Sequence, residues 1–512
     1  MPRTSLAPLA LLLCLCPAAG ARADDGAPAV DIHALNQLEY SVNTDEGRNP
    51  AKPKEILEEW LDVDVRFERA LIGFRYEAFQ PHELRADSAR EGIVQRYAAF
   101  DWENGSIRVG NFYEIFGRGL LFRSYEDRAI RIDSNMEGVL LTGRVARLAG
   151  KAFSGRIREV ETDRRTDVLR GADLEGDVGG GARVGASYLI LSSEAPGTAG
   201  AAEPRHEEVV GGRASFARDW FDASVEAGRI NRLYIRPEDL IPTPSRPNPR
   251  TYDDLRGTGF YGSLGLYPLS GVAVTAEYKD YDEFRFQPVN SSGTDYNNPP
   301  ALTRETSYTL LSRHPHILSP NDEKGFQVEA VVTPSPGTTI TLNRSETNEQ
   351  DGDLAFHEWF AEVRRPIGER VEAALVYDFI EDAESETKNR TPVIEIEYHP
   401  EGERSLRGEY QFQDTETARL GKSSTHFALV ECHVNLDLTF SVVGEHAGFL
   451  DPVSREGAKD DFVYAQADYH LTPNHFLSVT VGKRRAGYIC VGGICRFEPE
   501  FEGVEARFVT SF

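Results

Sequence analysis

Acidic side chains alternate with apolar ones along short runs in the second half of the chain. A β-strand points successive side chains to opposite faces, so the acids of each run share one face and the apolar residues share the other. The charged face must meet water, because a charge at the lipid midplane costs about 2–4 kcal/mol for a basic residue and less for an acid. We therefore expect a water-filled, cation-preferring lumen that is lined by Glu329, Glu372, Asp378, Glu395, Glu397, Glu409 and Asp468.

Basic side chains gather in two long links between such runs, Phe116 to Asn135 and Phe284 to Lys324. Guanidinium groups form strong, often bidentate bonds with carboxylates, so these links could bridge to an acidic wall. We predict that both links fold inward and partly occlude the lumen; the alternative is a pair of solvated external loops. The residues expected at the constriction are Arg118, Arg123, Arg128, Arg131, Arg313, His314 and His316.

Covalent and metal chemistry have weaker support. His314 and His316 flank Pro315, but no acidic or thiol partner stands at ligand spacing, so a loop-shaping turn is favoured over a metal site. Cys490 and Cys495 bracket Val-Gly-Gly-Ile, and in an oxidising compartment we expect a disulfide between them. The chain has no C-x-x-C-H haem motif and no G-x-S-x-G nucleophile elbow. We expect no cofactor, no metal and no enzyme activity.

The alternating runs predict the elements that position these groups. Short turns and long polar links follow one another in strict alternation, which is the pattern of an antiparallel transmembrane β-barrel. Counting the runs from Ala34 to Phe512 gives about 24 strands, with 22–26 as the range. An even count places both termini in the periplasm. We expect one domain, residues 24–512, with no separate plug or periplasmic domain, and we also expect a long loop at Ser193 to Glu207.

The two ends of the chain predict its destination. Residues 1–23 have a positive start, a short apolar run and the small-x-small site Ala21-Arg22-Ala23, as in a secretory signal peptide. The last stretch is a strand with one apolar face that ends on an aromatic residue. Its spacing resembles the closing strand that the barrel assembly machinery reads in outer-membrane proteins, with Gly503, Ala506, Phe508 and Phe512 as the signal.

One stretch carries a family resemblance. Gly110 to Leu120 reads G-N-F-Y-E-I-F-G-R-G-L, in which Gly117 and Gly119 allow a sharp turn or a close approach. Here the chain resembles a family of large, uncharacterised bacterial outer-membrane β-barrels that share a G-N-F-Y-x-x-F-G-R-G-L segment. Leu310 to His316, L-L-S-R-H-P-H, also resembles that group. The resemblance implies a barrel in the bacterial cell outer membrane and implies no particular activity.

Three functions are compatible with this reading. The leading hypothesis is a channel or translocation pore, and the alternative is a structural sheath around a secreted or electron-carrying partner. A barrel-borne enzyme is the third and has no catalytic constellation behind it. The net charge of −26 argues against nucleic acid as a partner. The partners that we expect are outer-membrane lipid, the barrel assembly machinery and, as a further candidate, a periplasmic or secreted protein.

Overall fold

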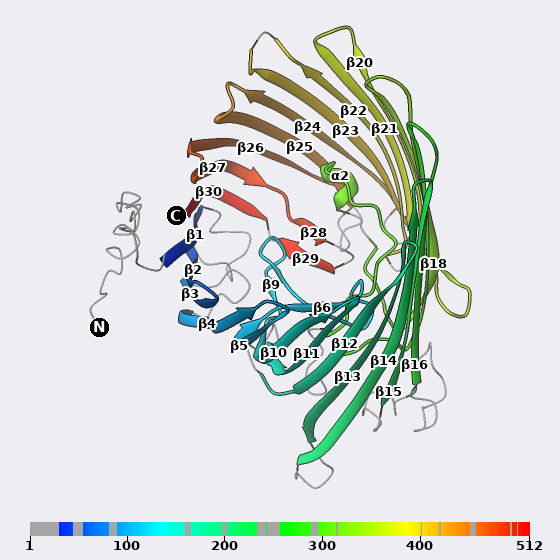
Figure 1. Ribbon diagram of the computed structural model, residues 1–512. Helices are drawn as coiled ribbons and strands as arrows, with labels where there is room; N and C mark the ends of the chain where they lie inside the picture. The colour runs from blue at the N-terminus through cyan, green and yellow to red at the C-terminus, as the bar shows by residue number, and fades with distance from the viewer. Residues whose placement is uncertain are drawn as a thin grey trace.

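The strands close into a single barrel. In the computed structural model, 24 antiparallel strands form one sheet, and β1 pairs with β30 to close it (Figure 1). The predicted fold class, an all-β barrel of about 24 strands, is confirmed. The structure describes residues 30–512 except 45–54, 81–89, 159–164, 197–201, 233–241, 243–255, 288–294, 314–315, 384, 401, 419–420, 451–456, 492–493 and 499. The predicted signal peptide therefore lies outside the described residues.

Each wall strand pairs with its neighbours along the chain. The first half of the wall consists of β1 (Val30–Asn43), β2 (Glu55–Phe67), β3 (Ala70–Gln80), β4 (Arg90–Trp102), β5 (Gly105–Phe112), β10 (Met136–Val145), β11 (Leu148–Ile157), β12 (Val168–Gly179), β13 (Ala182–Pro196), β14 (Ala202–Arg218), β15 (Phe221–Arg232) and β16 (Arg256–Leu269). The second half consists of β17 (Val272–Asp282), β18 (Asp322–Ser335), β19 (Thr338–Asn348), β20 (Leu354–Ile367), β21 (Val371–Asp382), β22 (Thr387–Tyr398), β23 (Ser405–Thr417), β24 (Gly421–His433), β25 (Leu438–Leu450), β26 (Gly457–Thr472), β27 (His475–Arg484) and β30 (Phe501–Ser511).

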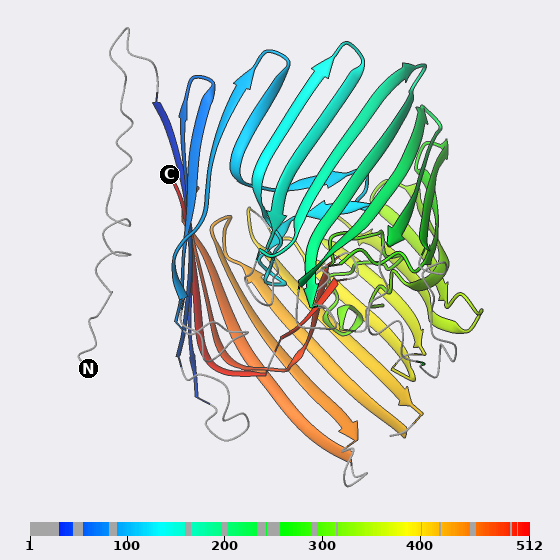
Figure 2. The same cartoon turned by 90° about the horizontal axis from the view of Figure 1, so that it is seen from below.

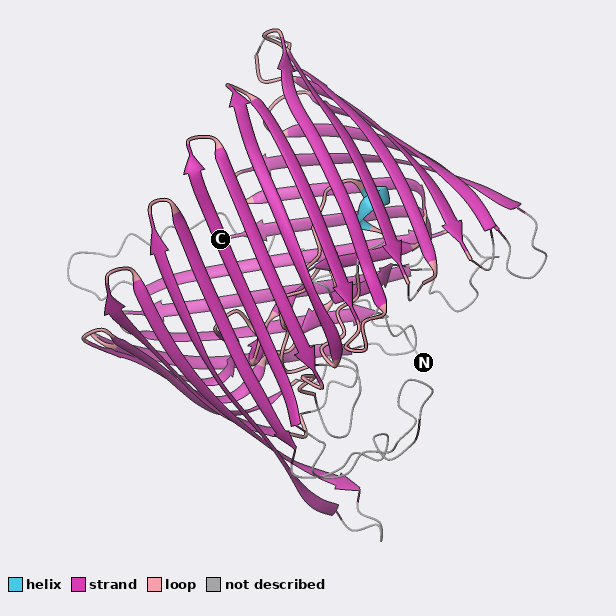
Figure 3. Cartoon of the chain, turned by 90° about the vertical axis from the view of Figure 1, so that its right-hand side faces the viewer, coloured by secondary structure: helices cyan, strands magenta, loops and turns pink. Residues whose placement is uncertain are grey.

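The remaining elements interrupt three of the links between wall strands. Between β5 and β10 lie β6 (Glu114–Phe116), β7 (Phe122–Ser124), β8 (Glu126–Asp127) and β9 (Ile132–Asp133). The short helix α2 (Thr309–Ser312) lies between β17 and β18, and the hairpin of β28 (Gly487–Val491) and β29 (Ile494–Glu498) lies between β27 and β30. Figures 1 and 3 show α2 enclosed by the wall. No helix in the described part of the chain is long and apolar enough to cross a membrane.

Tight turns line one rim of the barrel, as Figure 2 shows for the first hairpins. The backbones of Ala34 and Phe512 are hydrogen-bonded to each other at this same rim, with N···O distances of 3.2 and 2.9 Å. Which side of the membrane this rim faces stays a prediction. The expectation of a long loop at Ser193 to Glu207 is wrong, because the β13–β14 ladder continues to Pro196 opposite Ala202. The small and polar residues of this stretch resemble a loop in sequence, yet the backbone pairing continues through most of them.

The alternation in sequence becomes an inside and an outside. On β21, Leu375 and Tyr377 are exposed on the outer face, while Val376 and Asp378 are buried on the inner face. Other exposed apolar side chains of the outer face are Leu141, Val225, Leu264, Ile394, Ile396, Val442 and Val463. An apolar exterior over the middle of the wall is what contact with lipid requires.

The closing seam explains one of the four residues of the predicted assembly signal. Gly503 lies opposite Asn43 of β1, and a Cβ atom at this position would overlap the carbonyl oxygen of Val42. A larger residue would therefore push β1 and β30 apart. Ala506 and Phe508 pair with Val479 and Leu477 of β27, and Phe512 ends the strand. Recognition of these residues by the assembly machinery stays a prediction.

Candidate functional site

The link between β5 and β10, residues 113–135, turns into the barrel. Its β6–β7 hairpin is closed by Gly117 and Gly119, whose φ angles of 57° and 91° favour glycine. A Cβ atom on Gly117 would stand 2.5 Å from the carboxylate oxygens of Glu226, on wall strand β15. The backbone N–H of Arg118 donates to Glu226 Oε2 at 3.0 Å. The F-G-R-G-L sequence is thus the tip of a hairpin that touches the inner wall.

The hairpin is held by apolar packing. Phe116, Leu120, Leu121 and Phe122 are at most 1% exposed, and the rings of Phe116 and Phe122 lie 5.5 and 5.1 Å from that of Phe153 on β11. The rest of the cluster comes mainly from the wall strands β10 to β15 and includes Met136, Leu140, Ile157, Leu169, Leu189, Leu191, Val209 and Ile230. The inner wall beneath the hairpin therefore carries a covered apolar cluster, which the acidic faces of the second half did not predict.

Ion pairs fasten the other end of this link to β1, β2 and β3. Arg128 donates to Asp62 Oδ2 at 2.7 Å, and Arg131 lies 2.6 Å from Glu58 Oε2 and 2.9 Å from Glu39 Oε2. Arg75 reaches inward from β3, where it forms a bidentate pair with Glu126 (2.8 Å for each bond) and a further bond to Asp62. Sequence reasoning missed Arg75, because it stands within an ordinary strand.

Asp133 lies at the centre of a second set of contacts in the same link. It accepts hydrogen bonds from Tyr113 Oη (2.9 Å) and the backbone N–H of Asn135 (3.0 Å), and it pairs with Arg158 at 2.5 Å. Burial by itself would raise the pKa of Asp133, but Arg158, Asn135, Arg75 and Tyr113 together lower the pKa below its ordinary value of 3.8. The carboxylate is therefore charged at neutral pH and helps to order the link.

The remaining two arginines predicted in this link stack on aromatic rings. The guanidinium of Arg118 lies 5.5 Å from the ring centre of Tyr261, and that of Arg123 lies 4.3 Å from the ring centre of Tyr125. Burial raises the pKa of Tyr125 to about 12 even though the charge of Arg123 lowers it. Tyr125 therefore stays neutral and acts as a packing group.

The second link, residues 283–321, runs along the inner wall from β17 to β25 and returns. Arg304 lies 3.4 Å from Glu329 and stacks 3.8 Å from the ring centre of Phe360. In α2, the Leu310 backbone is hydrogen-bonded to two β23 side chains: Gln411 accepts from its N–H and Gln413 donates to its carbonyl. Farther on, Arg313 pairs with Glu445 of β25 at 2.6 Å.

His316 occupies the returning part of this link. It pairs with Glu323 of β18 at 3.0 Å and stacks on Phe356 with ring centres 5.0 Å apart. Its neighbour His314 lies outside the described residues. Within the described chain no group of three or more His, Cys, Asp or Glu side chains is arranged to hold a metal ion.

The two links bind each other. The backbone N–H of Asn298 donates to Gly119 O at 3.0 Å, that of Arg123 donates to Tyr296 O at 3.0 Å, and Asn297 Nδ2 donates to Leu120 O at 3.2 Å. We call residues 113–135 and the described part of 283–321 the luminal insert. Backbone bonds, a shared apolar cluster and wall ion pairs make it one body inside the barrel.

The seven predicted luminal carboxylates stand on the side of the wall that faces this insert, and arginines neutralise several of them. Glu372 pairs with Arg364 at 3.2 Å, and Glu395 pairs with both Arg364 and Arg407 at 2.7 Å. Arg407 also pairs with Glu409 at 2.5 Å. Glu329 faces Arg304, and Glu397 lies 3.5 Å from His399. Asp468 accepts a hydrogen bond from Gln466, and the side chain of Asp378 is buried, with 1% exposed. Sequence reasoning did not predict these pairings of Arg364 and Arg407, whose side chains cross from one strand to the next.

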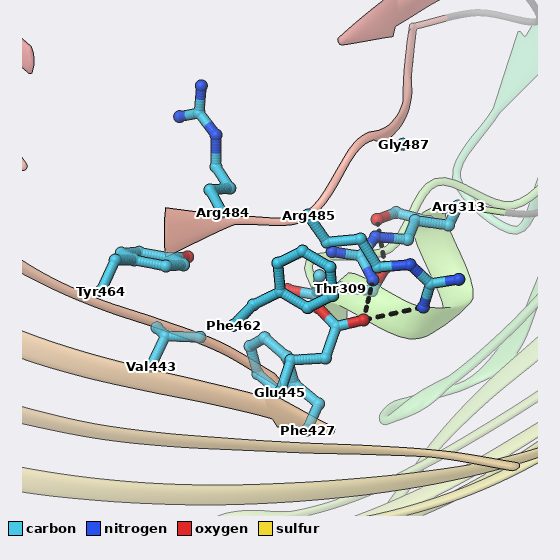
Figure 4. A pocket seen from close by; sticks show the side chains of 11 residues that line it. Thr309, Arg313, Phe427, Val443, Glu445, Phe462, Tyr464, Arg484, Arg485 and Gly487 are labelled. Carbon is cyan, nitrogen blue, oxygen red and sulfur yellow. Dashed lines mark hydrogen bonds and ion pairs between the residues drawn. The ribbon is translucent and has the colours of Figure 1, made fainter. Parts of the chain in front are cut away.

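A pocket of about 170 Å³ opens where the luminal insert meets the last wall strands. Figure 4 shows Arg313 from the insert and Arg485, which follows β27, converging on Glu445. Both donate to the same oxygen, Glu445 Oε1, at 2.6 and 2.8 Å. Arg484 and Tyr464 line the pocket farther from Glu445 (Figure 4). The other lining residues are Thr309, Ser312, Phe427, Val443, Phe462 and Gly487.

The predicted cysteine pair lies in the hairpin that follows this pocket. The backbones of Cys490 and Cys495 are direct partners in the β28–β29 register. Such partners have Cα atoms about 4.5–5.5 Å apart, which is within the range of a disulfide. Their side chains lie outside the described residues, so the disulfide stays a prediction. Among the described cysteines, Cys432 is a free, exposed thiol.

The whole sequence matches one protein family. Residues 5–512 match the family described as "Family of unknown function (DUF6029)". The chain belongs to this family. The match agrees with the expected uncharacterised family, whereas the shared G-N-F-Y-x-x-F-G-R-G-L segment stays a prediction. No curated protein matches the chain in sequence.

One solved structure shares the fold of this family member at low identity, and others align less well. An E. coli P pilus tip assembly intermediate, PapC-PapD-PapK-PapG, aligns with a TM-score of 0.51 at 12% identity over 96% of this chain. The chain spans 62% of the length of that structure's chain. The copper transporter OprC aligns at 10% identity over 95% of this chain and 82% of its own, with a TM-score of 0.44. A closed 24-stranded barrel with an apolar exterior places this family member in the bacterial outer membrane.

Proposed function

We propose that this protein is an outer-membrane channel or translocation pore that its own luminal insert narrows. One observation carries the proposal: two links far apart in sequence meet inside the barrel through backbone hydrogen bonds between Gly119 and Asn298 and between Arg123 and Tyr296. A barrel of 22 strands has a lumen wide enough to need a plug. Here the insert takes the place of one, and the protein needs no catalytic group for this role.

The proposed pore prefers cations. The wall of β18 to β26 carries the seven predicted carboxylates, and acids exceed bases by 26 in the whole chain. Arginines neutralise part of this charge, so we expect a moderate preference. Reversal potentials across a salt gradient measure it directly. The preference should weaken towards 1 M salt, where the Debye length falls to about 3 Å.

A sheath around a protein partner is the second candidate. The width of a 24-stranded barrel favours it, since such a wall could surround a folded or extended polypeptide. The P pilus structure with the same fold contains PapC together with PapD, PapK and PapG. A periplasmic or secreted protein is the partner class that we propose for this case.

Conductance in planar bilayers separates the two candidates. For the wild-type protein we expect small, steady channels. Replacing residues 296–318 with a short Gly-Ser turn removes most of the second link, so the conductance should rise several-fold while heat-modifiable migration shows an assembled barrel. The matched control is Phe260→Ala on the outer face, which should leave the conductance unchanged. If the shortened barrel assembles and conducts no more than the wild type, the insert does not narrow the pore.

A further inference from the structure

We propose that the pocket between α2 and the strands β24 to β27 binds a small anion with an apolar body, namely a carboxylate or phosphate group carried on an aromatic or alkyl group. Its lining combines Arg313, Arg484 and Arg485 with the buried apolar side chains of Phe427 and Phe462. This proposal does not depend on whether the barrel conducts, because it concerns binding alone.

The charge of the lining favours an anion. Two guanidinium groups, those of Arg313 and Arg485, meet one carboxylate, Glu445. Arg484 also lines the pocket, although its guanidinium is turned away from Glu445 (Figure 4). Glu505 lies 3.9 Å from Arg484 and offsets part of the positive charge. The balance remains positive, in a chain whose net charge is −26. Arginine is the side chain best suited to hold carboxylate and phosphate groups, because its fork matches two of their oxygens.

Glu445 shows how such an anion would be held. One of its oxygens accepts from both Arg313 Nη1 and Arg485 Nη1 (Figure 4). Each guanidinium has five N–H donors, and this contact uses one from each arginine. Gly487 lets the Arg313 side chain come close, because a Cβ atom there would stand 3.1 Å from Arg313 Nε. A ligand anion would join or replace the Glu445 carboxylate between the same two arginines.

The apolar side of the pocket selects the rest of the ligand. Phe427, Val443 and Phe462 are 3%, 5% and 3% exposed, and Leu310 of α2 packs against the first two. The volume of about 170 Å³ is smaller than a pocket for a drug-sized ligand, which is about 300 Å³ or more. A single aromatic ring or a short alkyl chain therefore suits the space.

A second pocket lacks the combination of arginines with buried aromatic side chains. It has about 230 Å³ beside the hairpin tip of the luminal insert and is lined by Arg118, Arg183 and Arg213 together with Glu175 and Glu226. There Arg213 already pairs with Asp173 at 2.6 Å and with Glu175 at 3.0 Å. Its lining contains no aromatic side chain. We therefore assign anion binding to the pocket at Glu445.

The test uses phenyl phosphate as the probe and phenol as its neutral counterpart. Saturation-transfer NMR on the purified, folded full-length barrel in a neutral detergent gives the Kd of each. We expect phenyl phosphate to bind saturably and more tightly than phenol. Arg485→Gln should weaken phenyl phosphate binding by at least about tenfold, because a charge-assisted contact is lost. Glu445→Gln should strengthen it, because the competing carboxylate disappears.

Arg407→Gln is the matched control, since Arg407 is a luminal arginine that pairs with Glu395 and Glu409 away from this pocket. It should leave the Kd of phenyl phosphate unchanged. The proposal is overturned if phenol binds as tightly as phenyl phosphate, if Arg485→Gln leaves the Kd unchanged, or if Arg407→Gln weakens binding as much. A barrel that conducts and binds no phenyl phosphate refutes this inference alone. A barrel that binds it and does not conduct refutes the pore alone.

Discussion

Phe116 offers the sharpest test of how the luminal insert is held in the barrel. Its side chain is fully buried, with ring centres 5.6 Å from Phe122 and 5.5 Å from Phe153. Replacing a buried Phe by Ala costs about 3–5 kcal/mol, from lost burial and from the cavity left behind. The 24 wall strands pair without Phe116, so this cost falls on the docking of the insert. We expect Phe116→Ala to undock the insert locally and to leave the barrel assembled.

Hydrogen exchange measures this undocking. The lower figure of about 3 kcal/mol corresponds to roughly a hundredfold loss of protection for amides that exchange through the docked state. The amides of Gly119 and Arg123, which donate to Phe116 O and Tyr296 O, should report it. Amides in the β21–β22 ladder should keep their protection. Phe260→Ala, on the outer face, is the matched control and should change neither set.

The result that would refute this reasoning is unchanged exchange at Gly119 and Arg123 in a folded Phe116→Ala barrel. The ion pairs alone would then hold the insert, and the apolar cluster would contribute little to docking. A loss of protection spread equally over the wall strands would also contradict it, because Phe116 would then stabilise the barrel itself. Rare, larger openings in single-channel records of Phe116→Ala would agree with undocking.

Three further predictions follow, two from the polar contacts of the luminal insert and one from the cysteines of the β28–β29 hairpin. Arg131→Gln removes the ion pair with Glu58, which is 1% exposed, and breaking such a buried pair costs about 3–5 kcal/mol. Hydrogen exchange of the insert amides should therefore become faster. Adding Glu58→Gln to this variant should partly restore their protection, because no unpaired carboxylate is then buried. The folded-state pKa of Asp133 is lowered, so the stability that its carboxylate contributes is complete above the ordinary value of 3.8 and is lost as the pH falls below that value. The amides of the insert should therefore stay protected from exchange at pH 5 and lose protection below about pH 4. Asp133→Asn should abolish this pH dependence. Unreduced protein should show Cys490 and Cys495 joined in one peptide by mass spectrometry, and finding both thiols free would contradict the disulfide.

The sequence by itself determined the wall of the barrel. Side chains on a strand alternate with period two, so the inner and outer faces follow from local order alone, as at Leu375, Tyr377 and Asp378. The rhythm of short turns and long links likewise predicts antiparallel pairing and the approximate strand count. The arginines and aromatic residues of Phe116 to Asn135 and Phe284 to Lys324 set these two links apart, because a solvated loop does not need residues of these types.

Only the tertiary structure decided what the inner wall touches. Leu189, Val209 and Ile230 face inward beneath the luminal insert, yet in sequence they cannot be told from residues that face lipid, because both surroundings are apolar. The pairing of Arg313 and Arg485 with Glu445 is likewise a property of the fold. These residues lie more than a hundred positions and 40 positions from Glu445, respectively, and their charges meet only after the barrel has closed and the insert has docked.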